Sequence, residues 1–577
     1  MKPKASLLPC ALAGALLLAL PGASVAGGGP AVIRASRVGI SPALRDLPPA
    51  AADAPGGEAV PINPLGEIGR AAEAPGAVPA SDDWALQEFF TPGEAPAAIP
   101  APALTFEGMN NTFGVLPPDT TGDVGPRHYV QMVNLGIAVY DKATGAVLLA
   151  PRDTNLLWTG FGGLCESHND GDPIVLYDPL ADRWLVSQFV YQPGSYRQCI
   201  AISQSGDPTG TYWLYDFLYS TTIFHDYPHL GVWPDGYYMT ANQFGPGGWD
   251  GGGVAVFERE QMLVGATARM IRFDLGNATP LGLNYGGQLP GDWDGGVPIP
   301  AGTPNFVMQW DDSSWIGDPT DTLRVWRVHV DWVTPANSTV GTNANFDPNH
   351  FLPTADANVL NCPSVSGQER PCIPQPGTAI QLDAIGDGRL MHRMPIRNFG
   401  THDSMLATNT VGVGASNRQA APRWYEIRGL LSGSPAVHQQ GTYAPDGTNR
   451  WMASLAMDAQ GNVLLGYSAA SASVFPALRY TGRLAGDPLN QMPQGEAIFF
   501  AGAGSQTSTS NRWGDYSTMS VDPGGDECGF WYTNEYYASN SGAGWRTRIG
   551  TAAFPGCLLL DDGYESGGTS SWSAVGQ

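Results

Sequence analysis

Short stretches of alternating apolar and polar residues follow one another along the chain, separated by turns rich in Gly, Pro, Asn and Asp. One half of the pattern is a strand that enters a tight turn and leaves as an aromatic or apolar strand, as in 173–189, 229–242, 453–468 and 517–536. The other half is a polar-ended strand, as in 137–145, 252–260, 323–332, 422–429, 476–483 and 545–550. After the first thirty residues no stretch stands out with the apolar spacing of a helix. The pattern therefore predicts an all-β protein.

The two halves together form a unit that returns every 40 to 60 residues or so, and strand-only units of roughly this size are typical of β-propeller blades. Their expected starts are Asp123, Asp172, Asp226, Asn305, Asp403, Trp451 and Asp515. This predicts a seven-bladed propeller, with six or eight blades as alternatives, and long insertions at about 270–300 and 335–375. Residues 105–111 are expected to add the last strand of the final blade, which closes the ring and leaves no open edge.

The first 26 residues have the parts of a secretory signal peptide. Lys2 and Lys4 precede an apolar run over 7–20, and the small residues Ser24 and Ala26 follow it as a cleavage site. The run is too short and wrongly flanked for a membrane span. The sequence therefore predicts a secreted protein, periplasmic or extracellular, with a signal peptide over 1–26 and no transmembrane segment.

Composition divides the rest of the chain into three parts. Residues 27–103 are rich in Ala, Pro and Gly and are predicted to be a flexible linker or pro-segment. The propeller is expected over 104–557, followed by a compositionally different tail over 558–577.

Six cysteines follow the signal peptide, an even number that suits an oxidising compartment. They fall as neighbours in the sequence, which predicts the disulfides Cys165–Cys199, Cys362–Cys372 and Cys528–Cys557, although the sequence alone leaves other pairings open. The propeller is therefore expected to be stapled by disulfides.

The net charge of −24 and the isoelectric point near 4.6 argue against nucleic acid and anionic membranes as partners, because both require a basic surface. The sequence also lacks HExxH, CxxCH, GxSxG, phosphate-loop and strand-following GxGxxG motifs, and its cysteine spacing gives no zinc site. These absences remove the common protease, haem, hydrolase and nucleotide-binding interpretations.

Polar residues recur where each repeat begins, and in a propeller these positions open onto one mouth of the central channel. They are expected to form an acidic funnel. The candidate catalytic residues are His225, Asp226, His402, Asp403, Arg450, Arg512, Asp515 and Tyr516. The candidate substrate-binding residues are Asp123, Trp451 and Trp513.

Such a funnel suits a sugar site. Carboxylates would serve as acid and base, arginine would hold an anionic substituent and tryptophan would stack on a sugar ring. The alternative for each single Asp is structural, because short polar side chains cap turns by binding backbone amides.

A calcium site is a second candidate. Asn169, Asp170 and Asp172, with Glu166 nearby, offer oxygen ligands at alternating positions. The pattern lacks the complete spacing of a calcium loop, and an ordinary polar loop held by Cys165 explains it equally well.

Five segments, 117–131, 169–178, 226–238, 450–458 and 512–523, resemble a group of uncharacterised secreted bacterial propeller proteins. A looser resemblance is to sialidase-like propellers, which use an arginine cluster, a Tyr/Glu pair and an aspartate. Arg450, Arg512 and Tyr516 match part of that set, but the repeated Ser-x-Asp-x-Gly-x-x-Trp boxes of sialidases are absent.

The end of the chain carries a separate resemblance. Glu565, Ser566, Gly567, Ser570 or Ser571, and Trp572 resemble the Glu-Ser-Gly-x-x-Ser-x-Trp tails of proteins secreted by Gram-negative bacteria. This resemblance implies export rather than a particular activity.

Two functions remain open, and the sequence leaves undecided whether the protein is an enzyme. In the first, a monomeric propeller binds or degrades an extracellular polysaccharide or cell-surface glycan, which could be anionic. Arg450 and Arg512 would then hold a carboxylate, with a histidine as base and Asp226 or Asp515 as acid. In the second, the protein is a non-enzymatic adhesion scaffold that binds through loops such as 243–253 or 335–375.

Overall fold

A computed structural model describes residues 29–50, 60–61, 83–87, 99–276, 285–316, 319–368 and 370–556. This part of the chain is all-β, and its α-helices are single turns: α1 (Leu164–Ser167), α2 (Arg259–Met262) and α3 (Ser313–Ile316). None of these helices is long and apolar enough to cross a membrane. The predicted fold class is therefore confirmed at the level of secondary structure.

The strands form sheets that follow one another in the sequence. The first sheet consists of β7 (Thr121–Val124), β8 (His128–Val133), β9 (Gly136–Asp141) and β10 (Val147–Asp153). The second consists of β11 (Ile174–Asp178), β12 (Arg183–Val190), β13 (Tyr196–Ser203) and β14 (Tyr212–Ser220), with β2 (Arg37–Ile40) added at its edge. The third is β15 (Phe224–Trp233), β16 (Gly236–Gly245), β17 (Gly248–Phe257), β18 (Arg269–Gly276) with β1 (Ala31–Arg34).

A larger sheet joins two sets of strands through the parallel pair β19–β24. Its first set is β19 (Leu289–Gly296), β20 (Asn305–Asp311), β21 (Thr322–His329), β22 (Thr339–Val340) and β23 (His350–Pro353). Its second set is β24 (Met394–Asn398), β25 (Asp403–Val413), β26 (Gln419–Arg428), β27 (Ala436–Tyr443) and β4 (Leu86–Gln87).

The remaining sheets complete the circuit. One consists of β28 (Asn449–Met457), β29 (Val463–Ser471), β30 (Val474–Arg483) and β31 (Glu496–Phe500). Another consists of β32 (Thr518–Val521), β33 (Phe530–Tyr537), β34 (Trp545–Ala552) and β5 (Leu104–Asn110). The last is the small pair β3 (Val60–Pro61) and β6 (Val115–Leu116).

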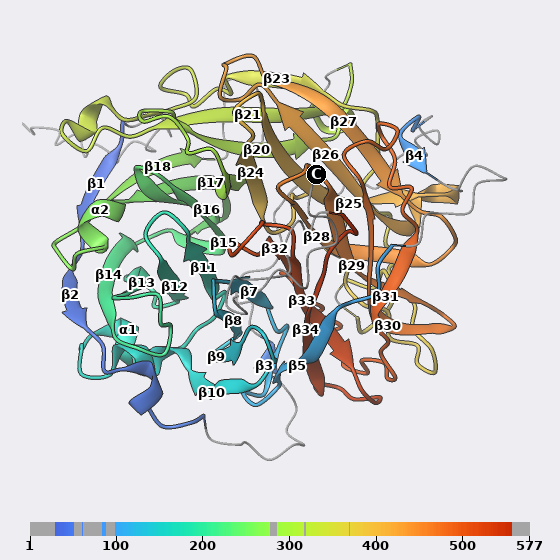
Figure 1. Ribbon diagram of the computed structural model, residues 1–577, viewed down its shortest axis with the longest axis horizontal. Coiled ribbons are helices and arrows are strands. Elements are labelled where there is room, and N and C mark those ends of the chain that lie inside the picture. Colours follow the sequence, from blue (N-terminus) through green and yellow to red (C-terminus); the bar gives the residue numbers. More distant parts are fainter. Residues whose placement is uncertain are drawn as a thin grey trace, which may run out of the picture.

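The first strands of these sets contact one another in a closed series. Strand β7 contacts β11, β11 contacts β15, β15 contacts β19 and β19 pairs with β24. Strand β24 contacts β28, β28 contacts β32, and β32 returns to β7. The sheets therefore surround a common centre in a β-propeller-like arrangement, with later strands lying progressively outward (Figure 1).

Two expected starting points prove to be one strand too late. Asn305 begins β20 and Asp403 begins β25, whereas the inner strands are β19, which begins at Leu289, and β24, which begins at Met394. Strand β19 has the sequence LPGDWDGG, and because five of its last six residues are glycine or aspartate, it lacks the apolar alternation that marks the other strands. Strand β24 follows a long insertion without a repeat, so the sequence pattern indicates the turn after β24 more clearly than the strand itself.

The predicted closing strand is confirmed. Strand β5 pairs antiparallel with β34, so a segment from the start of the folded body completes the last sheet. Gln131 of β8 fastens this closure, because its buried side chain accepts from Met109 N (2.8 Å) and donates to Thr533 Oγ1 (2.7 Å). The two ends of the folded body are thereby linked by main-chain and side-chain hydrogen bonds.

Part of the segment predicted as linker or pro-segment lies against the sheets. Strand β1 adds a fifth strand to the sheet of β15–β18, and β2 adds one to the sheet of β11–β14. Leu44, just after β2, is completely buried. The boundaries of the domains remain predictions, and the expected signal peptide and C-terminal tail lie outside the described residues.

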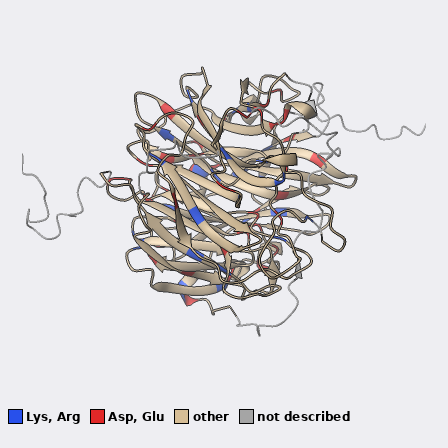
Figure 2. Cartoon of the chain, turned by 90° about the vertical axis from the view of Figure 1, so that its right-hand side faces the viewer, with Lys and Arg blue, Asp and Glu red and all other residues tan. Residues whose placement is uncertain are grey.

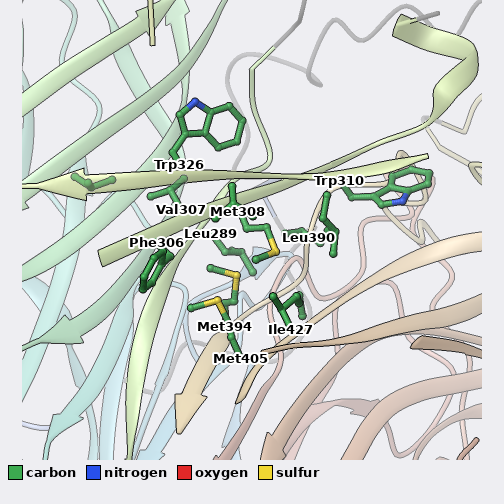
Figure 3. Close-up of a cluster of buried hydrophobic side chains, with 14 of the residues drawn as sticks. Leu289, Phe306, Val307, Met308, Trp310, Trp326, Leu390, Met394, Met405 and Ile427 are labelled. Atoms are coloured by element: carbon green, nitrogen blue, oxygen red, sulfur yellow. The ribbon is translucent and has the colours of Figure 1, made fainter. Parts of the chain in front are cut away.

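Large apolar side chains fill the space between neighbouring sheets. Figure 3 shows one such cluster, in which Leu289, Phe306 and Met308 face Met394 and Met405 across the join between β19 and β24. Burial of side chains of this size supplies most of the stabilisation of such a fold. In the side view of Figure 2, acidic and basic residues are interspersed among the strands.

Two predicted disulfides are confirmed: Cys165–Cys199 and Cys362–Cys372. Cys528 is also disulfide-bonded, and its predicted partner Cys557 lies outside the described residues. The first bridge ties α1 to β13, and the second closes a loop within the insertion between β23 and β24.

Replacing Cys165 and Cys199 by serine should lower the free energy of unfolding by about 2–4 kcal/mol. The pair closes a loop of 34 residues, against 10 for Cys362 and Cys372, so the same replacement of the shorter pair should cost less. Chemical denaturation of both double variants checks the order. Equal stability of wild type and both variants would contradict a structural role for the bridges.

Candidate functional site

The starts of several inner strands share an unusual backbone conformation. Asp119, Asp172, Tyr227, Met452 and Asp515 all have positive φ, between 41° and 64°. Residues other than glycine rarely adopt this left-handed region, although Asp tolerates it better than most. The same backbone conformation thus recurs just before β7, β11 and β32 and near the starts of β15 and β28.

These bends bring acidic residues from different sheets together. We call Asp119, Asp172, Asp226, Asp515, Arg512 and Tyr516 the mouth cluster. Tyr516 Oη lies 3.2 Å from Asp172 Oδ2 and 3.2 Å from Pro228 O. Arg512 forms an ion pair with Asp515, and Asp119 N donates to Gly514 O at 3.0 Å. Four of the predicted site residues, Asp226, Arg512, Asp515 and Tyr516, therefore do converge, together with Asp172.

A long insertion between β23 and β24 supports the loop that carries Arg512. The Gln375 side chain donates to Gln506 O at 3.1 Å and accepts from Gln506 N at 2.8 Å. Asp383 N donates to Asn511 O at 3.0 Å, and the Asp383 carboxylate lies 3.7 Å from Arg512 Nε. The position of Arg512 is thus fixed from a part of the chain more than a hundred residues away.

The acids of the mouth cluster differ in protonation. Burial, with the Asp226 charge adding to it, raises the pKa of Asp172 to about 8. Burial and the neighbouring Asp172 and Asp515 hold the pKa of Asp119 well above its usual range. These two acids are therefore protonated at neutral pH.

Asp226 lies closer to solvent than this pair. Asp226 is a partly exposed residue, as is Asp515, whereas Asp119 and Asp172 are buried. Burial and the Asp515 charge raise the pKa of Asp226 to about 6, against the opposing effect of Arg512. The cluster thus presents one carboxyl group that titrates near neutrality beside one that is ion-paired with arginine.

Two histidines that the sequence reasoning did not single out pack beneath Tyr516. His229 Nδ1 and His392 Nδ1 are 3.2 Å apart, and the two rings lie 5.1 and 5.8 Å from the Tyr516 ring. Burial lowers the pKa of His229 well below its usual value and that of His392 to about 3, so both are neutral. Arg389, 5.0 Å from the Tyr227 ring and paired with Asp387, was also missed.

His225 lies away from the mouth cluster despite its neighbour Asp226. It is completely buried, with Nε2 3.0 Å from Gln198 Oε1 and its ring stacked 4.0 Å from Tyr219. Burial and the Arg272 charge lower its pKa to about 3. A histidine held neutral inside the core does not fit the expected role of a catalytic base.

His402 and Asp403 lie at the other end of the inner strand. They follow the turn after β24, where His402 stacks on Phe399 at 4.8 Å and Asp403 Oδ2 accepts from Leu430 N at 2.8 Å. The expectation that they join the funnel is corrected, because Asp403 begins the second strand of its set and the chain has already crossed the sheet.

Arg450, Trp451 and Trp513 belong to the core. Arg450 is buried and pairs with Glu496 at 2.7 Å and Asp446 at 2.9 Å. Both indoles are 0% exposed and lie 5.8 Å apart. A side chain without exposed surface offers no face to a sugar, so the expected stacking platform and paired arginine clamp are not formed.

Asp123 has the structural role that the sequence left open. Its Oδ2 accepts from Tyr177 N of the neighbouring inner strand at 2.7 Å, and Asp292 accepts from Val232 N at 2.8 Å in the same manner. Each therefore satisfies a backbone N–H across the junction between two sheets.

The expected calcium ligands point to different partners. Asn169 Nδ2 donates to Leu135 O at 2.9 Å, Asp170 Oδ2 accepts from Tyr191 N at 2.8 Å, and Asp172 faces Tyr516. Within the described ranges no group of three or more His, Cys, Asp or Glu residues is arranged to hold a metal ion.

Comparison with known proteins gives only distant structural similarity. No family model matches the chain, and no curated protein matches it. The polysaccharide lyase Uly1 is 11% identical over 82% of this chain and 95% of its own, with a TM-score of 0.34. An ulvan lyase bound to -[GlcA(1-4)Rha3S]- is 11% identical over 81% and 95%, with a TM-score of 0.35. Drosophila semaphorin 1b is 9% identical over 81% and 89%, with a TM-score of 0.32. Similarity at this level does not assign a function.

The variant Asp172→Asn should make stability less dependent on pH. The folded-state pKa of Asp172 is raised above its unfolded value, so the folded state retains a proton that the unfolded chain loses, and stability falls as pH rises from about 4 to about 8. The maximum slope for one such group is about 1.4 kcal/mol per pH unit. Melting temperatures at pH 5 and pH 8 check this, and an equal pH dependence in wild type and variant would contradict the raised pKa.

Proposed function

We propose that the protein is a secreted, monomeric, seven-bladed β-propeller that degrades an extracellular glycan at the mouth cluster. The observation that carries the proposal is the pairing of two partly exposed carboxyl groups in different electrostatic environments. Asp226 titrates near neutrality, whereas Asp515 is ion-paired with Arg512. The closed series of seven inner strands from β7 to β32 supports the count of seven blades.

Most glycoside hydrolases use such a pair. One carboxylic acid protonates the departing glycosidic oxygen, and a second carboxylate acts as base or nucleophile. Asp226, with a pKa of about 6, is suited to the acid role, and Asp515 to the carboxylate role. Tyr516 and the protonated Asp172 are buried in the same cluster, where Tyr516 Oη donates to Asp172 Oδ2 at 3.2 Å.

The charges of the site favour a neutral glycan over an anionic one. Arg512 is already paired with Asp515, Arg389 with Asp387 and Arg450 with Glu496. A substrate carboxylate would have to displace one of these partners and approach further acidic groups. This modifies the expectation from the sequence, in which Arg450 and Arg512 together hold a substrate carboxylate.

The proposal is tested by incubating the mature protein with neutral polysaccharides (arabinan, galactan and xylan) and with uronic-acid polysaccharides. Reducing ends report hydrolysis, and unsaturated products report elimination. We expect new reducing ends from a neutral polysaccharide, with a rate that declines above about pH 6 as Asp226 loses its proton.

The variants Asp226→Asn and Asp515→Asn should each lower that rate by about 10²–10⁴-fold. Asp403→Asn is the matched control and should retain the wild-type rate, since Asp403 follows the end of the inner strand β24 that is remote from the mouth cluster. Turnover that survives both mouth-cluster variants would contradict the proposed site. No turnover or binding on any polysaccharide, with the fold intact, would favour the adhesion scaffold.

A further inference from the structure

A group of aromatic side chains lies beside the mouth cluster on the second and third sheets. Tyr191 follows the end of β12, Tyr196 begins β13 and Phe224 begins β15. Phe224 is completely buried, and its ring lies 4.8 Å from Tyr191 and 5.5 Å from Tyr196. The two tyrosine rings are 5.7 Å apart and both remain partly exposed. We call Tyr191 and Tyr196 the tyrosine shelf, with Phe224 as its floor.

Two short connections place this shelf next to the mouth cluster. Phe224 is two residues before Asp226 in β15, so their Cα atoms are at most about 7 Å apart. Tyr191 N donates to Asp170 Oδ2 at 2.8 Å, and Asp170 is two residues before Asp172. The shelf therefore borders both the partly exposed acid and the buried pair beneath it.

The chemistry of the shelf differs from that of the mouth cluster. Its contacts are aromatic, and the nearby Arg197 is engaged by Asp216 at 2.7 Å, so it is not available to hold an anion. Tyrosine presents a rigid apolar ring and a polar hydroxyl at little cost in conformational entropy. A sugar ring has the matching features, with C–H groups on its faces and hydroxyl groups around its edge.

We propose that the tyrosine shelf is a binding subsite for a neutral sugar residue of the same glycan chain whose neighbouring linkage lies at Asp226. The inference rests on the proposed function and adds an extended substrate, because two adjoining subsites favour a chain over a single sugar. Tyr191 and Tyr196 contribute binding, and the chemistry remains with Asp226 and Asp515.

The test uses the full mature chain with two double variants. In Tyr191→Ala/Tyr196→Ala the rings are removed, whereas Tyr191→Phe/Tyr196→Phe keeps the rings and loses only the hydroxyl groups. Phe351→Ala is the matched control, since Phe351 is an exposed aromatic residue on β23. Affinity electrophoresis in gels containing arabinan, galactan or xylan measures binding, and initial rates on long and short oligosaccharides of the same sugar measure turnover.

The alanine variant should bind about tenfold more weakly to the polysaccharide that retards the wild type, as expected for loss of ring contacts. It should raise KM on long oligosaccharides while kcat and the rate on a disaccharide stay close to wild type. The affinity of the phenylalanine variant for the polysaccharide should be within about twofold of the wild-type affinity, because the rings that stack on the sugar remain. The affinity of Phe351→Ala should equal that of the wild type. Single alanine variants replace the double one if it fails to fold.

Wild-type affinity in the alanine variants, together with turnover that Asp226→Asn abolishes, would overturn the shelf and leave the proposed function intact. An equal loss of turnover rate on the disaccharide and on long oligosaccharides would also overturn the shelf, since it would indicate a disturbed mouth cluster. Absence of both binding and turnover in the wild type would overturn the proposed function and the shelf together.

Discussion

The fold depends on how its inner strands meet at the centre, where each strand would otherwise bury backbone N–H groups without partners. Side chains of neighbouring strands supply those partners: Asp123 accepts from Tyr177 N, Asp172 from Tyr227 N and Ser454 from Met519 N. An unsatisfied buried N–H costs about 1–3 kcal/mol, so short polar side chains are required at these positions. The same requirement explains why Asp recurs along the repeats whether or not it takes part in chemistry.

Concentrating acids in this way has an electrostatic consequence. The four carboxyl groups of this cluster cannot all ionise within a partly desolvated space: Asp119, Asp172, Asp226 and Asp515. The pKa values of three of them are therefore raised, and the fourth, Asp515, forms an ion pair with Arg512. Burial keeps Asp119 and Asp172 protonated at neutral pH, Arg512 forms an ion pair with Asp515, and the pKa of Asp226 is raised to about 6. A structural arrangement of caps thereby produces the differentiated carboxyl groups on which acid–base chemistry relies.

The sequence predicted those features that depend on local pattern. The repeating strands, the closing strand and two disulfides follow from alternation, turn residues and spacing; the closing strand was predicted over 105–111 and is observed as Leu104–Asn110. Asp226, Arg512, Asp515 and Tyr516 lie together in the structure, as their positions near the start of β15 and just before β32 suggest, and their role in a site remains a prediction.

What the sequence could not predict depends on which way a side chain points and on contacts between distant segments. Arg450 and Trp451 begin an inner strand as well, but β28 directs them into the core between sheets. Arg389 and His392 belong to an insertion whose path follows no repeat in the sequence.

The most direct test of the central claim is a crystal structure of Asp226→Asn with an oligosaccharide of the polysaccharide that binds the protein. The account predicts a glycosidic oxygen within hydrogen-bond distance of residue 226, with the chain extending towards Tyr191. An oligosaccharide bound only at peripheral loops, with the mouth cluster unoccupied, would contradict it.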